Sequence, residues 1–118
     1  MRMDNNNKDR LIVLWTSGDK EVALNMVFLY TFNSKNKGWW KDITIIVWGA
    51  STRLLSEDKE LQDYTKKIID EGVKIEACEV CSDNFGVSEE LRKLGIEVKR
   101  MGEPLTEYIK KGENIITI

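Results

Sequence analysis

The two cysteines of the chain, Cys78 and Cys81, are the residues best suited to chemistry, and they lie three positions apart. They follow the apolar alternation of residues 73–77, where a strand pattern gives way to a more polar segment. Parallel α/β sheets present their functional groups just beyond the carboxyl ends of their strands, so we expect a thiol displayed at the rim of the sheet. The chain contains no histidine. This excludes an imidazole general base within one subunit and leaves sulfur, carboxylates, hydroxyls and backbone donors.

Four interpretations of the cysteine pair are open. A C-x-x-C pair can be a redox dithiol, although the thioredoxin type places it at a helix start after the first strand of its fold. A structural zinc site would need ligands from two subunits, because zinc takes four ligands and one chain offers two cysteines and no histidine. One thiolate could act as a nucleophile or carry a persulfide. Alternatively, both cysteines are small buried apolar residues, which free cysteine often is.

The charges around the thiols have opposite effects on ionisation of the sulfur. Backbone donors of a helix that starts nearby would favour a thiolate, whereas Glu76, Glu79 and Asp83 would disfavour it if they point at the sulfur. Alternation along the strand places Glu76 on the same side as Cys78. The sequence therefore favours a displayed sulfur over a strongly activated one.

Short apolar runs alternate with amphipathic stretches along the chain, which predicts alternating strands and helices. Strands are expected at residues 11–15, 43–48, 73–77, 96–100 and 114–118. Every connection is long enough to hold a helix, which indicates right-handed crossovers and helices on both faces of the sheet. The predicted fold class is therefore α/β, a three-layer α/β/α sandwich with a five-stranded, mainly parallel sheet. Residues 10–118 are expected to form one domain after a disordered lead-in at 1–9.

The first helix is expected to follow the capping segment Thr16–Asp19 and to run for about fifteen residues. Helical spacing directs five of its residues toward the core, namely Val22, Ala23, Met26, Val27 and Tyr30. The other apolar residues nearby would form surplus surface: Leu24, Phe28 and Leu29, with Trp39 and Trp40 in the following connection. Such a surface predicts a closed homo-oligomer, unless the tryptophans fold back over the helix ends.

The later helices have their own start signals. Ser56 and Ser88 are predicted N-caps, and Pro104 suits the first position of the last helix. Residues 78–86 are expected to form a loop.

Four polar or glycine-rich loops leave the carboxyl ends of the first four predicted strands, at residues 16–19, 49–52, 78–86 and 101–104. They lie at one edge of the sheet and could converge on one pocket. Besides Cys78 and Cys81, its predicted residues are Ser17, Gly18, Gly49, Ser51, Thr52, Gly102 and Glu103. The plainer alternative is that these glycines and hydroxyls only cap helices. Residues 16–19 contain neither a Walker loop nor the dinucleotide fingerprint, because only one glycine is present.

Composition excludes several classes of function. The 118 residues carry 18 basic and 20 acidic side chains, a net charge of −2, which leaves no cationic surplus for nucleic acid. The longest apolar runs, 22–30 and 43–48, are far shorter than the ~20 residues that cross a bilayer, so no membrane partner is predicted. Residues 1–10 lack the pattern of a signal peptide. Two cysteines three positions apart form no disulfide framework, which fits a reducing cytoplasm. Neither a metal nor a cofactor is predicted.

Four segments, in this order and spacing, resemble the DsrE/DsrF-like family of small sulfur-handling α/β proteins. They are Leu14-Trp15-Thr16-Ser17-Gly18-Asp19, Val47-Trp48-Gly49-Ala50-Ser51 with Leu54-Leu55, residues 72–87 with both cysteines, and residues 94–106. The resemblance implies a five-stranded parallel sheet of the flavodoxin-like topology class and assembly into homotrimers or hexamers. In sulfur-relay members a cysteine just after strand three carries a persulfide between protein partners, and Cys78 corresponds to it by position. Cys81 is an additional thiol found in some relatives.

The leading expectation is thus a sulfur-transfer or sulfur-carrier protein, a sulfurtransferase if it is an enzyme. Cys78 would be the persulfide-bearing nucleophile, and Cys81 a helper that resolves the persulfide or forms a reversible disulfide. Its partners would be sulfur-donor and sulfur-acceptor proteins and copies of the chain itself. The competing expectation is a non-catalytic module that binds a small ligand or supports assembly.

Overall fold

The computed structural model describes residues 9–118, so the predicted lead-in, apart from residue 9, lies outside the described residues. Strands and helical segments follow one another as β1 (Arg10–Trp15), α2 (Lys20–Val22), the π-helical η1 (Ala23–Phe28), α3 (Leu29–Asn36), β2 (Asp42–Val47), α4 (Ala50–Glu57), α5 (Lys59–Asp70), β3 (Lys74–Cys78), α6 (Glu79–Phe85), α7 (Ser88–Lys93), β4 (Glu97–Lys99), α8 (Gly102–Lys110) and β5 (Asn114–Thr117). All five predicted strands are present. Within residues 9–118 no helix combines the length and apolarity needed to cross a membrane.

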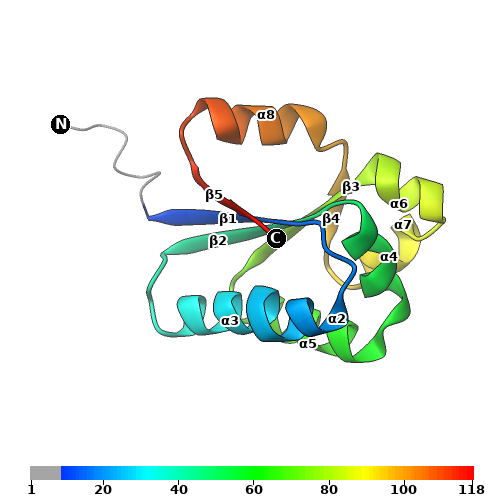
Figure 1. Ribbon diagram of the computed structural model, residues 1–118, viewed down its shortest axis with the longest axis horizontal. Helices are drawn as coiled ribbons and strands as arrows, with labels where there is room; N and C mark the ends of the chain where they lie inside the picture. Colours follow the sequence, from blue (N-terminus) through cyan, green and yellow to red (C-terminus); the bar gives the residue numbers. More distant parts are fainter. Residues whose placement is uncertain (1–8) are drawn as a thin grey trace.

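The strands form one parallel sheet in the order β4-β3-β2-β1-β5. The chain steps outward from β1 to β4 and then returns to the far side of β1. Right-handed crossovers therefore place the helices between β1 and β4 on one face and α8 on the other. Figure 1 shows α8 above the sheet, with α3 and α5 beneath it. The predicted three-layer α/β/α sandwich is confirmed. The strand beyond β1 is the fifth, whereas in flavodoxin-like sheets it is the second.

Each face of the sheet has its own apolar core, because side chains alternate along a strand. Val13 and Ile45 belong to the larger core, beneath α3 and α5. Ile12, Cys78 and Met101 belong to a smaller core on the opposite face, where partly buried side chains of α8 cover them. Cys78 therefore lies on the side of the sheet that α8 covers.

The helix after β1 is continuous from α2 to α3, but its η1 segment has π geometry. A π turn holds more residues than an α turn, because its hydrogen bonds join residues i and i+5. The residues that face the core are therefore spaced differently from those of an ideal α-helix. The predicted faces are wrong at two positions: Phe28 is fully buried, whereas Met26 is 41% exposed.

The connection to β2 is only partly covered. Leu29 and Trp39 are exposed, as predicted. Trp40 folds back, and its indole N–H donates to the hydroxyl of Tyr30 at 3.1 Å. Leu24 packs against the larger core. The surplus apolar surface is therefore smaller than predicted.

The boundary between α4 and α5 differs from the prediction. Ser56 lies within α4, where its hydroxyl donates to the carbonyl of Arg53. Asp58 is the N-cap of α5 instead, because its carboxylate accepts the N–H of Leu61 at 2.9 Å. A carboxylate is as good a capping group as a hydroxyl, so local sequence alone did not separate the two.

Three further details of the prediction are wrong. The expected loop at 78–86 contains α6, which begins directly after Cys78. Ser88 is the first residue of α7 rather than its cap, and its hydroxyl contacts Ser82 and Asp83. Pro104 is the third residue of α8, where the absence of a backbone N–H is also tolerated because the first-turn donors have no partner within the helix.

Candidate functional site

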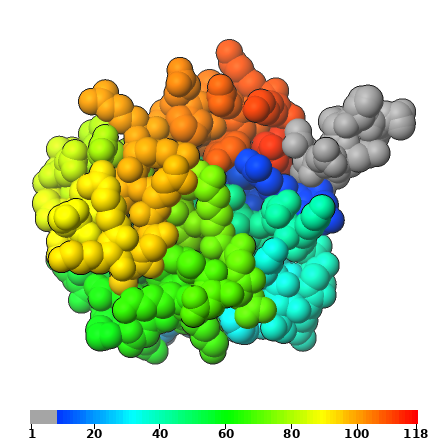
Figure 2. Space-filling model, turned by 180° about the vertical axis from the view of Figure 1, so that it is seen from behind, coloured from blue at the N-terminus to red at the C-terminus, as the bar shows by residue number. Residues whose placement is uncertain are grey.

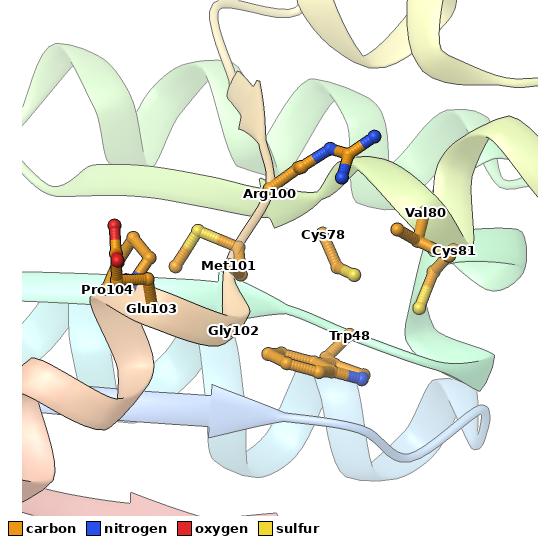
Figure 3. Close-up of a pocket in the computed structure, with 9 residues that line it drawn as sticks. All are labelled: Trp48, Cys78, Val80, Cys81, Arg100, Met101, Gly102, Glu103 and Pro104. Carbon is orange, nitrogen blue, oxygen red and sulfur yellow. The ribbon is translucent and has the colours of Figure 1, made fainter.

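A pocket of about 700 Å³ opens at the carboxyl end of the sheet on the α8 side. It is lined by the segments that follow β2 and β4, the end of β3 and the starts of α6 and α8: Trp48, Cys78, Val80, Cys81, Arg100, Met101, Gly102, Glu103 and Pro104 (Figure 3). These segments meet because the carboxyl ends of parallel strands share one edge. Seen from behind in Figure 2, α6 and α7 (yellow) border the start of α8 (orange).

Cys78 forms the floor of this pocket. It is the last residue of β3 and the residue before α6. Ala77 faces the larger core, so alternation turns Cys78 to the α8 side, where it packs with Ile12 and Met101. Its side chain is only 5% exposed. The thiol therefore lies deeper than the rim position that the sequence predicted.

Cys81 lies one helical turn further on, in α6, and is half-buried. The Cys78 thiol and the backbone N–H of Gly49 are the two neighbouring groups that act on the Cys81 thiol. Burial raises the pKa of Cys81. The neighbouring Cys78 raises this pKa further, whereas the backbone N–H of Gly49 lowers it. At the bottom of the pocket, Cys81 is therefore a thiol that holds its proton more strongly than an ordinary cysteine does.

The walls of the pocket are mainly apolar. Val80, Met101 and Pro104 contribute aliphatic or thioether surface, and Trp48 contributes its indole ring. Figure 3 shows Trp48 and Arg100 on opposite sides of Cys78. A flat apolar molecule could therefore lie against the indole above the thiols.

Arg100 is the cationic side chain among the lining residues. Its guanidinium is largely exposed and lies 3.9 Å from the carboxylate of Glu79. That carboxylate is closer to Arg92, at 3.2 Å. Arg100 is therefore only weakly neutralised within the chain and is able to bind an anion at the pocket opening.

Ser51 and Thr52 lie outside the lining of the pocket, and both are fully buried. The Ser51 hydroxyl donates to the carbonyl of Trp15 at 2.6 Å and accepts the backbone N–H of Trp48 at 3.2 Å. It thus ties the ends of β1 and β2 together and fixes the backbone that carries the Trp48 ring.

Ser17 and Gly18 also lie outside the lining. The Ser17 hydroxyl accepts the N–H of Asp19 at 3.1 Å, and the Asp19 carboxylate accepts the N–H of Val22 at 3.1 Å, so this segment caps the first helix. Gly18 packs against α4, since an added Cβ would be 3.1 Å from the Cβ of Ala50. These residues follow the plainer interpretation of helix capping and close packing.

The structure thus brings four of the predicted site residues to the pocket, namely Cys78, Cys81, Gly102 and Glu103. Gly49 lies outside the lining, but its backbone N–H lowers the pKa of Cys81. The lining residues that sequence reasoning missed are Trp48, Val80, Arg100, Met101 and Pro104. Trp48 had a usable signal, because it continues the alternation of β2 two residues after Ile46, on the α8 face.

A cluster of charges lies on the same face, two residues before Cys78. Glu76 is fully buried. One carboxylate oxygen accepts the hydroxyl of Tyr108 at 2.9 Å, and the other lies 2.9 Å from Lys99 Nζ and 3.1 Å from Lys74 Nζ. Burial alone would raise the pKa of Glu76, but the bonds to Lys99, Lys74 and Tyr108 together lower it. The predicted proximity of Glu76 to Cys78 therefore brings little uncompensated negative charge.

Among residues 9–118 there is no group of three or more His, Cys, Asp or Glu side chains placed to hold a metal ion. The pair of thiols contributes two ligands at most, and its remaining neighbours in the pocket are mainly apolar.

Comparison with known proteins gives a family and a set of similar structures. Residues 9–118 match the DsrE/DsrF-like family. No curated protein matches the chain. Among solved structures, the chain is similar to the conserved protein of unknown function BT1422 from Bacteroides thetaiotaomicron, with 47% identity, 100% of both chains covered and a TM-score of 0.94.

Two more distant structures show the fold alone. The protein of unknown function MTH1491 from Methanobacterium thermoautotrophicum has 17% identity and a TM-score of 0.70, over 92% of this chain and 98% of that one. The ychN protein from E. coli has 15% identity and a TM-score of 0.67, over 93% and 98%. Because the family match spans every residue that the structure describes, the chain belongs to the DsrE/DsrF-like family.

Proposed function

We propose that the protein is a sulfur carrier that holds a sulfur atom as a persulfide on Cys78. The observation that carries this proposal is that both thiols, Cys78 and Cys81, line one pocket at the carboxyl end of the sheet. Membership of the DsrE/DsrF-like family supports it, because sulfur relay is the activity that the family suggests.

Loading is a transfer between two thiolates. The Cys78 thiolate attacks the outer sulfur of a persulfide donor, R–S–SH. The sulfur–sulfur bond of the donor breaks, R–S⁻ leaves with the electron pair, and Cys78 becomes Cys78–S–SH. No net oxidation occurs, and the same exchange with an acceptor thiolate unloads the carrier.

Cys81 has two roles in this scheme. While protonated, it offers its S–H group to Cys78 as a neighbouring hydrogen-bond donor. When deprotonated, it attacks the inner sulfur of the Cys78 persulfide, which forms the Cys78–Cys81 disulfide and releases HS⁻. The outer sulfur is thereby reduced and the two cysteines are oxidised. Because burial raises the pKa of Cys81, this release is slow at neutral pH and speeds up as the pH rises. A reducing compartment such as the cytoplasm returns the disulfide to two thiols.

A second candidate function is supported by the same pocket. A volume of about 700 Å³ with mainly apolar walls suits a non-catalytic module that binds a small ligand, in which case the buried Cys78 only contributes to the lining.

Intact-mass measurement after incubation with a persulfide donor separates the two functions. We expect the wild-type protein to gain the mass of one sulfur atom and Cys78→Ser to gain none. Cys81→Ser, the matched control, keeps a hydroxyl donor beside Cys78 but lacks the resolving thiol, so it should still load and should keep the added sulfur longer. An unmodified wild-type mass would instead favour the binding module.

A further inference from the structure

The pocket is much larger than a transferred sulfur atom requires. A water molecule occupies about 30 Å³ in the liquid, and a single sulfur atom is of comparable size. A volume of about 700 Å³ falls in the range of sites that enclose small organic molecules. A protein that received only inorganic sulfur would not need this space above its thiols.

The walls define the body of such a molecule. The Trp48 indole lies on one side of Cys78, and Val80, Met101 and Pro104 complete the apolar lining (Figure 3). An aromatic ring stacked on an indole gains attraction beyond the burial of its area. The lining therefore favours a flat, apolar body over a sugar or a polar peptide.

The charges at the opening define where a negative group would lie. Arg100 is on the opposite side of Cys78 from Trp48, and the nearby cation Lys99 is already paired with Glu76 and Glu97. Glu103 also lines the pocket and disfavours a second negative group near its own carboxylate. The anionic group should accordingly lie beside Arg100, close to the reacting sulfur, where the guanidinium would also stabilise a departing anion.

We propose that the pocket accepts a small organic sulfur donor with an aromatic body, whose transferable sulfur is bonded to an anionic leaving group. The body stacks on Trp48, the anionic group contacts Arg100, and the terminal sulfur meets Cys78. This inference rests on the proposed function and adds the substrate class. With a thiosulfonate, R–SO₂–S⁻, the Cys78 thiol supplies its sulfur and one proton. The sulfur–sulfur bond breaks, the sulfinate R–SO₂⁻ leaves with the electron pair, and Cys78–S–SH remains, so atoms and charge balance.

Three donors of the same terminal sulfur test the substrate class: benzenethiosulfonate, methanethiosulfonate and inorganic thiosulfate. Loading is followed by intact mass in Cys81→Ser protein, so that the persulfide persists. We expect benzenethiosulfonate to load Cys78 about tenfold faster than methanethiosulfonate. Trp48→Leu should remove this preference and Trp48→Phe should retain most of it, since Phe keeps an aromatic face.

Arg100 is tested by a matched pair of surface variants. Arg100→Gln should slow loading from both organic donors about tenfold. Arg92→Gln, which also removes a guanidinium near Glu79 but lies outside the lining, should leave loading unchanged. Since Arg100 is largely exposed, its variant should fold even if Trp48→Leu does not.

A non-reacting ligand separates failure of this inference from failure of the proposed function. Binding of benzenesulfonate, which has no sulfur to transfer, is measured by calorimetry on the same proteins. Equal loading from all three donors without benzenesulfonate binding would overturn the substrate class and leave the persulfide carrier intact. Benzenesulfonate binding that requires Arg100 and Trp48, without loading by any donor, would support the ligand class and overturn the persulfide function.

Discussion

At the scale of single residues, Glu76 links three elements to the floor of the pocket. It lies on β3, its lysine partners come from β3 and β4, and Tyr108 comes from α8. A buried carboxylate is costly unless it is paired and hydrogen-bonded. All these contacts therefore have to form together, and they fix the position of α8 over Cys78.

Replacing Glu76 with Gln tests this coupling. At neutral pH we expect a loss of about 1–3 kcal/mol in the free energy of unfolding, because a neutral amide cannot satisfy Lys74 and Lys99 equally well. The folded-state pKa of Glu76 is lowered, so its contribution is present above the unfolded-state pKa, about 4.3, and is lost as the pH falls through the folded-state value. The difference in free energy of unfolding between wild type and Glu76→Gln should therefore become smaller at low pH. Urea unfolding from pH 7 to pH 3 measures it.

Glu97→Gln is the matched control for this experiment. Glu97 contacts the same two lysines, at 3.1 Å and 3.7 Å, but it is half exposed. Glu97→Gln should lower the free energy of unfolding by less than about 0.5 kcal/mol. Equal losses for both carboxylates would contradict a special role for the buried one.

Some residue positions were predictable from local pattern and others were not. Strand alternation was enough to put Glu76 and Cys78 on one face. The partners Lys99 and Tyr108 required the pairing of β3 with β4 and the docking of α8, which depend on contacts far apart in the chain. Arg100 was missed for the same reason, because an exposed arginine after a strand has no local pattern that assigns it to a pocket.

At the scale of elements, the strands were easier to predict than the helices. The predicted strands are either short apolar runs, as at residues 11–15 and 43–48, or apolar alternations, as at residues 73–77 and 96–100, and each of the five became a strand. The η1 segment had no such signature, because Ala23 and Phe28 fit an α-helix as well as a π-helix. Its wider turn is selected by packing against the sheet, which brings Phe28 edge-on to Trp15 at 5.2 Å. The start of α6 was missed because the segment after Cys78 lacks a conventional N-cap.

The loop between β2 and α4 gives a prediction at this scale. Gly49 has φ +74° and ψ −135°, a conformation that other residues rarely adopt. An added Cβ would meet nothing closer than the carbonyl oxygen of Thr16, at 4.0 Å. Gly49→Ala should therefore cost about 1–3 kcal/mol through backbone strain alone. It should also displace the Gly49 N–H, which lowers the pKa of Cys81, and so raise the pKa of that thiol further.

The measurement is the rate of Cys81 alkylation as a function of pH. It is made in a Cys78→Ser background, where Cys81 is the one thiol left to react. Gly38→Ala is the control, because Gly38 also has a positive φ, +71°, and open space around it. It should lower stability and leave the Cys81 titration unchanged. An unaltered titration in Gly49→Ala would show that its N–H does not act on the sulfur.

At the scale of the whole molecule, we expect the chain to form a closed homo-oligomer, a trimer or a hexamer of two trimers. Met26, Leu29 and Trp39 leave apolar surface exposed on the first helix and the connection after it. Light scattering at micromolar concentration should give three or six times the chain mass of 13.7 kDa. Leu29→Lys should reduce the mass to that of one chain, because it places a charge in the contact.

The control for assembly is Lys66→Glu, which changes the charge of an exposed residue on α5. Its mass should equal that of the wild type. A wild-type mass of 13.7 kDa would exclude the oligomer.

The sheet order has a consequence for how the folded protein fluctuates. Four crossover segments could have been shared evenly between the two faces, but in the described residues the order β4-β3-β2-β1-β5 gives one face α8 as its crossover helix, with α6 beside it only at the pocket. No residue of α8 is buried, and its Tyr108 is held by Glu76 and by Arg10, 5.0 Å above the ring. Elements with so few buried contacts open before the rest of a domain. The amides of α8 should thus exchange with deuterium ahead of those in the sheet, and each such opening uncovers Cys78 to a folded partner while the five strands stay paired.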